Sequence, residues 1–244
     1  MAIIVIYDPW FYSCTECLSL VSKPQMVWRL DVTLHWFQLE DWSTCIMDVK
    51  ASNILLDKEW KPRILLAKIV QGGLDLGQGT ISLEFLEQIP QIDTLVVPIS
   101  GGGMIAGIAI AAKAINPAIR ILAAEPKGAD DAAQSKAAGR IIKLHEINTI
   151  ADGLQAFLGD HTWPVVRDLV DDKITVEDFE IIKAMKLCFK ILKIVIEPSG
   201  AIGLAAVLSE TFQKNPTWKD CKHIGIVVSG GNVDMDVFWE SLNK

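Results

Sequence analysis

From residue 77 onward, apolar runs of strand length alternate with runs of helix length. Apolar residues continue almost without interruption between turn signals at three places, and we expect strands there, at residues 94–99, 119–124 and 224–228. Helices are expected between and around them, at residues 80–86, 105–115, 130–138, 163–169, 176–192 and 201–214. Because strands that alternate with helices favour right-handed crossovers, the pattern predicts an α/β fold: a parallel sheet with flanking helices.

Residues 1–70 follow no sustained helix or strand period. Five of the eight tryptophans lie among them, at positions 10, 28, 36, 42 and 60. The apolar run at the start of the chain is too short for a membrane span and lacks the basic flank of a signal peptide. We therefore divide the chain into a poorly specified N-terminal segment, residues 1–70, and an α/β domain, residues 77–244.

Amino-acid composition excludes several classes of protein for this chain. Half of the 244 residues are hydrophobic and 22% are charged, which favours a folded core. The net charge of −7 gives no basic surface for nucleic acid, and no apolar stretch is long enough for a membrane. The five cysteines form no disulfide framework, and the pair Cys14 and Cys17 lacks the second pair of a zinc site. A soluble, cytoplasmic protein is expected.

Two glycine-rich loops follow predicted strands and carry the first indication of a site. Ser100-Gly101-Gly102-Gly103-Met104 lies between the strand at residues 94–99 and a helix, and Ser229-Gly230-Gly231-Asn232 follows the last strand. Glycines leave backbone N–H groups unshielded, and the helix start adds its positive dipole end. The first loop therefore predicts a phosphate cradle at the carboxyl edge of the sheet.

Two other interpretations of the first loop stay open at this point. Gly101, Gly103 and Gly107, with Glu125 at the end of the next strand, imitate a dinucleotide-binding pattern, although the spacing is G-x-G-x-x-x-G. The loop is also compatible with a tight turn in which only glycine fits. The residues of the loop alone do not separate these possibilities.

Four further motifs follow in order, at residues 125–131 (Glu-Pro-Lys-Gly-Ala-Asp-Asp), 149–153 (Thr-Ile-Ala-Asp-Gly), 197–201 (Glu-Pro-Ser-Gly-Ala) and 229–232 (Ser-Gly-Gly-Asn). In this order they closely resemble the serine racemase family of the plant type, which belongs to the fold-type II pyridoxal-phosphate (PLP) enzymes. Serine/threonine dehydratases are near relatives of that family. The resemblance covers residues 77–244 and implies the large domain of such an enzyme, truncated, with the small domain missing.

The resemblance implies a PLP site. Residues 100–104 match the loop whose backbone N–H groups hold the PLP phosphate, and Gly153 and Glu197 match positions near the cofactor. Ser229 matches the serine that faces the pyridine nitrogen, where a neutral hydroxyl favours α-proton exchange and β-elimination over transamination. The alternative interpretation of Ser229 is a turn-forming serine.

It also implies two further sites. Glu125, the carbonyl of Ala129 and Asp131 match a site for a divalent cation, Mg²⁺ or alternatively Ca²⁺ or Mn²⁺, which take oxygen ligands. The same carboxylates also suit a solvated helix N-terminus. Lys193 and Asn232 match positions that contact the activator ATP at a homodimer interface, and Lys193 is equally compatible with a solvated helix.

By family, the reaction is racemisation of serine and elimination of water from serine to pyruvate and ammonia. The covalent PLP lysine of the family stands in a Ser-x-Lys-x-Arg-Gly-Ala motif, and the opposite-face serine stands in Ser-Gly-Asn-His. The sequence contains neither motif. We therefore expect no catalytic residue of either kind and little or no activity. The alternative is a non-catalytic pseudoenzyme or a partner subunit of an intact racemase.

Residues 46–68 have a resemblance of their own. Asp48, Lys50 and Asn53 match the catalytic loop of plant receptor-like kinases, in which Asp is the base and Asn holds Mg²⁺. Ile46-Met47 replaces His-Arg, and no Asp-Phe-Gly follows. These departures exclude an active kinase, and the segment is interpreted as a fused or mispredicted fragment.

Overall fold

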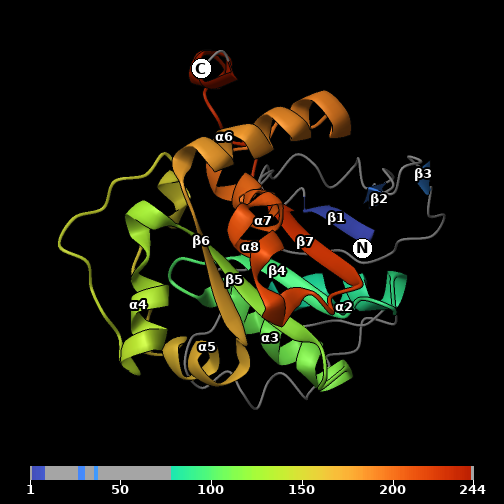
Figure 1. Ribbon diagram of the computed structural model, residues 1–244, viewed down its shortest axis with the longest axis vertical. Helices are drawn as coiled ribbons and strands as arrows, with labels where there is room; N and C mark the ends of the chain where they lie inside the picture. The colour runs from blue at the N-terminus through green and yellow to red at the C-terminus, as the bar shows by residue number, and fades with distance from the viewer. Residues whose placement is uncertain (1, 9–26, 31–35, 38–77, 243–244) are drawn as a thin grey trace, which may run out of the picture.

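The computed structural model describes residues 2–8, 27–30, 36–37 and 78–242, and its centre is one mixed β-sheet (Figure 1). The strands are β1 (Ala2–Asp8), β2 (Val27–Leu30), β3 (Trp36–Phe37), β4 (Thr94–Pro98), β5 (Arg120–Pro126), β6 (Asp172–Val176) and β7 (His223–Ser229). They are ordered β3-β2-β1-β7-β4-β5-β6. The block β1-β7-β4-β5-β6 is parallel, and β2 and β3 join antiparallel. The predicted α/β fold with a parallel sheet is confirmed.

Helices cover both faces of the sheet. They are α2 (Gly79–Gln88), α3 (Gly103–Ile115), α4 (Asp131–Ala138), α5 (Trp163–Leu169), α6 (Asp178–Leu187), α7 (Pro198–Leu208), α8 (Glu210–Lys214) and α9 (Met235–Leu242). In Figure 1, α2, α3 and α5 lie on one side of the parallel strands, and α6, α7 and α8 lie on the other. Sheets covered on both faces need strands that are apolar throughout, and every residue of β4 is buried.

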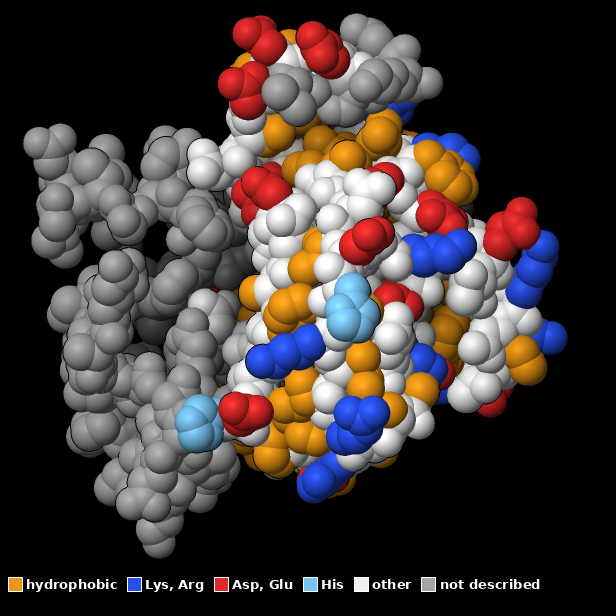
Figure 2. All heavy atoms as spheres, turned by 90° about the vertical axis from the view of Figure 1, so that its left-hand side faces the viewer, with side chains coloured by type: hydrophobic (Ala, Val, Ile, Leu, Met, Phe, Trp, Pro, Cys, Tyr) orange, Lys and Arg blue, Asp and Glu red, His pale blue; other side chains and the backbone are white. Residues whose placement is uncertain are grey.

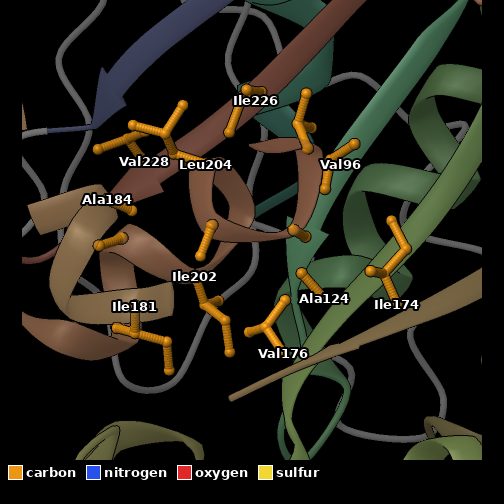
Figure 3. Close-up of a cluster of buried hydrophobic side chains, with 14 of the residues drawn as sticks. Val96, Ala124, Ile174, Val176, Ile181, Ala184, Ile202, Leu204, Ile226 and Val228 are labelled. Carbon is orange, nitrogen blue, oxygen red and sulfur yellow. The ribbon is translucent and has the colours of Figure 1, made fainter. Parts of the chain in front are cut away.

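Alternate residues of each strand enter two separate cores. Val96, Leu122 and Ile226 pack with helices α6 and α7, as Figure 3 shows for part of this cluster. Their chain neighbours Leu95 and Ile121 pack with α2 and α3 on the opposite face. Since successive side chains of a strand point to opposite faces, one continuous apolar run supplies both cores.

Two predicted helices are wrong in their extent. Residues 176–192 were expected as one helix, but β6 ends at Val176, α6 covers Asp178–Leu187, and a π-turn covers Cys188–Leu192. Glu177 instead forms a capping box with Glu180 and starts the helix after the strand. The strand β6 was not predicted because charged residues interrupt the apolar pattern of Asp-Asp-Lys-Ile-Thr-Val. These residues lie at the edge of the sheet, where side chains remain partly exposed.

The helix expected at residues 201–214 is two helices, α7 and α8. Ser209 separates them: its backbone is extended and its hydroxyl accepts a hydrogen bond from the N–H of Phe212. The sequence also showed no strand period in residues 1–70, whereas β1 pairs in parallel with β7 along its whole length. Such long-range pairing brings together residues that are far apart in sequence, so a local pattern does not reveal it.

The surface carries no extended patch of one charge on the face shown in Figure 2, where acidic and basic side chains lie among apolar ones. None of the helices in the described part of the chain has the length and apolar character needed to cross a membrane.

Candidate functional site

Three neighbouring parallel strands, β7, β4 and β5, end at one edge of the sheet. Val96 of β4 lies opposite Ile226 of β7, and Pro98 lies opposite Ala124 of β5. In this register the loops after the three strands open at the same edge. The sequence motifs at residues 100–104, 125–131 and 229–232 are therefore neighbours in space, as expected for ligand sites in α/β sheets.

The loop between β4 and α3 presents unused backbone donors. Gly102 has a φ of 87°, a left-handed conformation that glycine adopts most readily, and it forms the N-cap of α3. Within the described residues, no group accepts a hydrogen bond from the N–H of Gly101, Gly102 or Gly103. Met104 belongs to the first turn of α3. Free N–H groups beside a helix N-terminus favour an anion.

The other side of this loop is held by residues 156–162, here called the support segment. The Ser100 hydroxyl donates to the Ala156 carbonyl at 2.9 Å and accepts from the Ala156 N–H at 3.1 Å. The Gly101 carbonyl accepts from the Thr162 hydroxyl at 2.6 Å and from the Gly159 N–H at 3.2 Å. The side chain of Ser100 therefore fixes the loop, and only the backbone remains for a ligand.

The second glycine loop closes around Glu197. The Glu197 carboxylate accepts a hydrogen bond from the N–H of Asn232 at 3.1 Å, and the Glu197 N–H donates to the Gly230 carbonyl at 3.2 Å. Gly230 has a φ of 80°, and a Cβ there would overlap with the Glu197 carboxyl group. Glu197 therefore shapes this loop.

Gly153 joins the same cluster. Its N–H donates to the hydroxyl of Ser199 and to the carboxylate of Asp152, both at 2.9 Å. Partial burial raises the pKa of Glu197, and the charge of Asp152 raises it further. The sequence did not single out Asp152 or Ser199, although both lie inside the motifs at residues 149–153 and 197–201.

Ser229 is the last residue of β7 and is half-buried. In the part of the chain that the structure describes, nothing forms a hydrogen bond with its hydroxyl. Its carbonyl packs so closely on Gly200 of α7 that a Cβ at Gly200 would overlap with it. The backbone of Ser229 is thus fixed while its hydroxyl remains available.

A buried pair of carboxyl groups follows β5. Glu125 accepts hydrogen bonds from the N–H groups of Ala133 at 2.7 Å and Ala132 at 3.1 Å, in the first turn of α4. Burial, together with the nearby charge of Asp131, raises the pKa of Glu125 to about 8. Asp131 accepts a hydrogen bond from the Leu158 N–H at 3.0 Å. Ala129 lies buried in the turn between them.

This pair does not form a complete metal cluster of side chains. Among the described residues, no group of three or more His, Cys, Asp or Glu side chains is placed to hold a metal ion. A cation here would need backbone carbonyls or water as further ligands, as Ca²⁺ and Mg²⁺ accept. The predicted ligand set of two carboxylates and the Ala129 carbonyl is of this kind.

The positions predicted for ATP are both exposed. Lys193 ends the π-turn with a φ of 61°, and its ammonium group donates to the Lys190 carbonyl at 2.6 Å. Asn232 contacts Glu197 through its backbone N–H. The kinase-like residues 46–68, the pair Cys14 and Cys17 and the lysines of residues 1–70 lie outside the described residues.

Comparison with known proteins decides between the interpretations of the glycine loop. A family model described as "Pyridoxal-phosphate dependent enzyme" matches residues 70–230. The chain belongs to the pyridoxal-phosphate dependent enzyme family. The predicted resemblance is confirmed, and the dinucleotide interpretation is set aside.

Relatives within the PLP-dependent family are serine racemases. The serine racemase of Oryza sativa subsp. indica is 69% identical over 168 residues, which cover 69% of this chain and 50% of the rice protein. That of Arabidopsis thaliana is 61% identical over 228 residues, covering 92% of this chain and 68% of the relative. The structure of maize serine racemase superposes with a TM-score of 0.65 at 68% identity, covering 68% of this chain and 51% of the maize chain. The chain thus spans about half the length of the rice and maize proteins.

The geometry at the glycine loop fits the phosphate of PLP. Three consecutive residues offer N–H groups without acceptors in the described structure, and the α3 dipole favours negative charge. A side chain at Gly102 would meet Thr162 and Leu158 at 2.8 to 3.0 Å. Glycine is therefore needed at this position for the loop to pack against residues 156–162.

Proposed function

We propose that the chain binds PLP with its phosphate at the glycine loop, residues 100–104, and with Ser229 facing the pyridine nitrogen. The observation that carries this proposal is the set of N–H groups of Gly101, Gly102 and Gly103, at the start of α3, for which the described residues supply no acceptor. PLP supplies an electron sink that weakens the bonds at the α-carbon of a bound amino acid. The available Ser229 hydroxyl supports the second contact.

The chain's own residues define the chemistry around that cofactor. A hydroxyl at Ser229 leaves the pyridine nitrogen without a full positive charge, which favours α-proton exchange and elimination over transamination. Gly153 and Glu197 are held together by hydrogen bonds through Ser199 and Asn232 and border the same sheet edge. The substrate we propose is serine, because the relatives are serine racemases, with racemisation and dehydration as the reactions.

We propose that the chain turns over serine little or not at all. The sequence lacks the Ser-x-Lys-x-Arg-Gly-Ala motif that supplies the PLP lysine and the Ser-Gly-Asn-His motif that supplies the opposite-face serine. A lysine without a tuned environment stays protonated and is a poor nucleophile. We therefore expect this chain to bind the phosphate of PLP and to have little or no catalytic activity.

The test is PLP titration of the purified chain, followed by absorbance and fluorescence, with Gly102→Val as the comparison. Saturable binding that Gly102→Val abolishes supports the cradle, whereas equal binding by both proteins contradicts it. Borohydride reduction and peptide mapping then locate any covalent pyridoxyl group. A single labelled lysine together with serine turnover would overturn the proposal of inactivity.

The alternative is a non-catalytic partner subunit. It is supported by the same missing lysine motif in a chain that retains the sheet edge and its loops. We expect co-expression with a full-length plant serine racemase to yield a mixed complex if this alternative holds. Separate elution of the two chains would reject it.

We propose a Mg²⁺ site, or one for Ca²⁺ or Mn²⁺, at Glu125, Asp131 and the Ala129 carbonyl. Two buried carboxyl groups, one in β5 and one at the start of α4, support it. Mg²⁺ is expected to raise the unfolding temperature of the chain, and Glu125→Gln is expected to remove this rise. An equal rise in both proteins would place the ion elsewhere.

We further propose ATP contacts at Lys193 and Asn232, homodimerisation, and a cytoplasmic location. Exposure of Lys193 and Asn232 supports the first. ATP that shifts the unfolding temperature of the wild type but not of Lys193→Ala would support this site. A fluorescent fusion tests the location.

A further inference from the structure

Thr162 lies at a position typical of a helix-capping residue, but its hydroxyl forms a hydrogen bond with another element. It is the residue before Trp163-Pro164 at the start of α5, a typical N-cap position for threonine. Its hydroxyl makes no capping hydrogen bond to α5. The hydroxyl is directed instead at the glycine loop, from which Thr162 is separated by about sixty residues in sequence.

The hydrogen bonds of this hydroxyl fix one peptide plane. The Thr162 Oγ1 atom lies 2.6 Å from the Gly101 carbonyl oxygen and 3.1 Å from the Gly159 carbonyl oxygen. A hydroxyl has one proton to donate, and the shorter contact identifies Gly101 as its acceptor. Its oxygen in turn accepts from the Gly159 N–H at 3.2 Å.

The orientation of the Gly101–Gly102 peptide plane determines the direction of the Gly102 N–H. In a trans peptide the carbonyl and the following N–H point in opposite directions. Because the Gly101 carbonyl is held toward Thr162, the N–H of Gly102 is directed away from the support segment. No acceptor among the described residues meets it there.

The support segment is itself fixed at three points, so Thr162 acts from a rigid base. Ala156 pairs with Ser100 through both its N–H and its carbonyl. The Leu158 N–H donates to the buried Asp131 carboxylate at 3.0 Å. Gly102 packs directly on the segment, since a Cβ there would lie 2.8 Å from Thr162 Oγ1.

We propose that Thr162 is a positioning residue for the phosphate loop: its hydroxyl holds the Gly101–Gly102 peptide with the N–H directed at the anion. This rests on the proposed function, because it assigns a role in the same cradle. Thr162 does not touch the ligand. It acts by preventing a flip of the peptide that would turn a carbonyl toward the phosphate.

The test compares the full-length wild type with Thr162→Val, Thr162→Ser and the control Thr211→Val, whose threonine is exposed on α8. Binding of inorganic phosphate and of PLP is measured with the unfolding midpoint of each protein. Loss of one hydrogen bond to a carbonyl predicts that Thr162→Val binds both ligands about fivefold to tenfold more weakly. Thr162→Ser and Thr211→Val are expected to bind like the wild type.

The outcomes separate the two proposals. If the wild type binds phosphate and Thr162→Val binds it equally, the role of Thr162 is overturned and the cradle stands. If Thr162→Ser binds as weakly as Thr162→Val, the hydroxyl is not the group responsible, and the role is again overturned. If the wild type binds neither phosphate nor PLP, the cradle itself is rejected together with this role. Weaker binding by Thr162→Val alone, in a sample that unfolds cooperatively, supports the role.

Discussion

Two glycines of this chain allow the energetic cost of a left-handed backbone to be compared with the cost of a steric overlap. Gly139 has a φ of 66° and no atom within 4 Å of the place where a Cβ would stand, whereas a Cβ at Gly200 would overlap with the Ser229 carbonyl. Gly139→Ala is expected to cost about 1 kcal/mol of unfolding free energy, from the left-handed backbone alone. Gly200→Ala is expected to cost about 3 kcal/mol or more, because a backbone segment must move.

Denaturant unfolding of both variants checks this prediction, and PLP titration adds a second readout. Since Gly200 contacts the backbone of Ser229, Gly200→Ala is expected to weaken PLP binding, and Gly139→Ala is not. Equal unfolding free energies for the two variants would mean that the contact at Ser229 relaxes without cost.

Glu84 of α2 makes the stability of the chain depend on pH. Burial, together with the charge of Glu87, raises the pKa of Glu84 from 4.5 to about 7. The folded chain therefore holds a proton that the unfolded chain loses above pH 4.5, so the unfolding free energy falls as the pH rises to about 7. Glu84→Gln is expected to flatten this fall, as measured by denaturant unfolding from pH 4.5 to 8 without divalent cations.

The exposed Glu146 supplies the control for Glu84. Glu146→Gln is expected to leave the slope against pH unchanged. Part of the slope should remain in Glu84→Gln, because burial also raises the pKa of Glu125. If the unfolding free energy of Glu84→Gln fell with pH as steeply as that of the wild type, Glu84 would not be the source of the pH dependence.

Sequence reasoning predicted that the glycine loops meet at one sheet edge, but it did not predict the contacts that hold them. The loop at residues 100–104 and the motifs at 125–131 and 229–232 lie together at one sheet edge, as expected. Thr162 was missed because none of the motifs recognised in the sequence contains it. Its actual partner, Gly101, belongs to another element, and nothing in the spacing of the two residues indicates the contact.

At the scale of elements, the junction between α6 and α7 departs from regular α-helix. A π-turn, Cys188–Leu192, follows α6, and Lys193 ends it in the left-handed region with a φ of 61°. This conformation costs lysine about 1 kcal/mol, whereas glycine adopts it freely. Lys193→Gly is therefore expected to raise the unfolding free energy by about 0.5 kcal/mol after the entropy of the unfolded glycine is included.

Lys190→Gly is the matched comparison, because Lys190 is equally exposed but lies inside the π-turn. It is expected to lower the unfolding free energy by about 1 kcal/mol. Thermal and denaturant unfolding of the two variants measure the difference. A Lys193→Gly protein less stable than the wild type would show that the lysine side chain contributes more than its backbone costs.

Elements were predictable where the apolar pattern is local and uninterrupted. The strands β4, β5 and β7 were found within a few residues because both faces of each are buried. The strand β6 was missed because charged residues interrupt its pattern at the sheet edge, and β1 because its partner β7 is remote in sequence. The capping box at Glu177 starts α6 after the end of β6, and Ser209 divides the helix predicted at residues 201–214 into α7 and α8.

For the whole molecule, the two candidate sites share one structural base. The support segment binds the glycine loop through Ala156 and Thr162 and the carboxyl pair through Leu158. Both candidate sites therefore make hydrogen bonds to the same backbone segment. This arrangement needs only the elements from β4 to α5, all of which lie within the residues that match the PLP-dependent family.

The largest exposed apolar side chains predict self-association of the chain. Phe179 of α6 is 56% exposed and Trp239 of α9 is 45% exposed, and Leu187, Ile191 and Met235 on the same helices and the π-turn are also exposed. In Figure 1 α6 lies toward the C-terminus, at the end of the molecule opposite α3. Large apolar side chains that are exposed in a folded chain occur at protein interfaces. We therefore expect a concentration-dependent dimer in sedimentation velocity.

The variant that tests this is Phe179→Ser combined with Trp239→Ser. Removing two large apolar side chains from an interface is expected to weaken dimerisation at least about tenfold, since each buried aromatic contributes more than about 1 kcal/mol. Ile115→Ser is the control, because Ile115 is 52% exposed but ends α3, away from α6. A dimer that the double variant leaves intact would place the interface elsewhere. A monomer at every concentration would contradict the prediction of self-association.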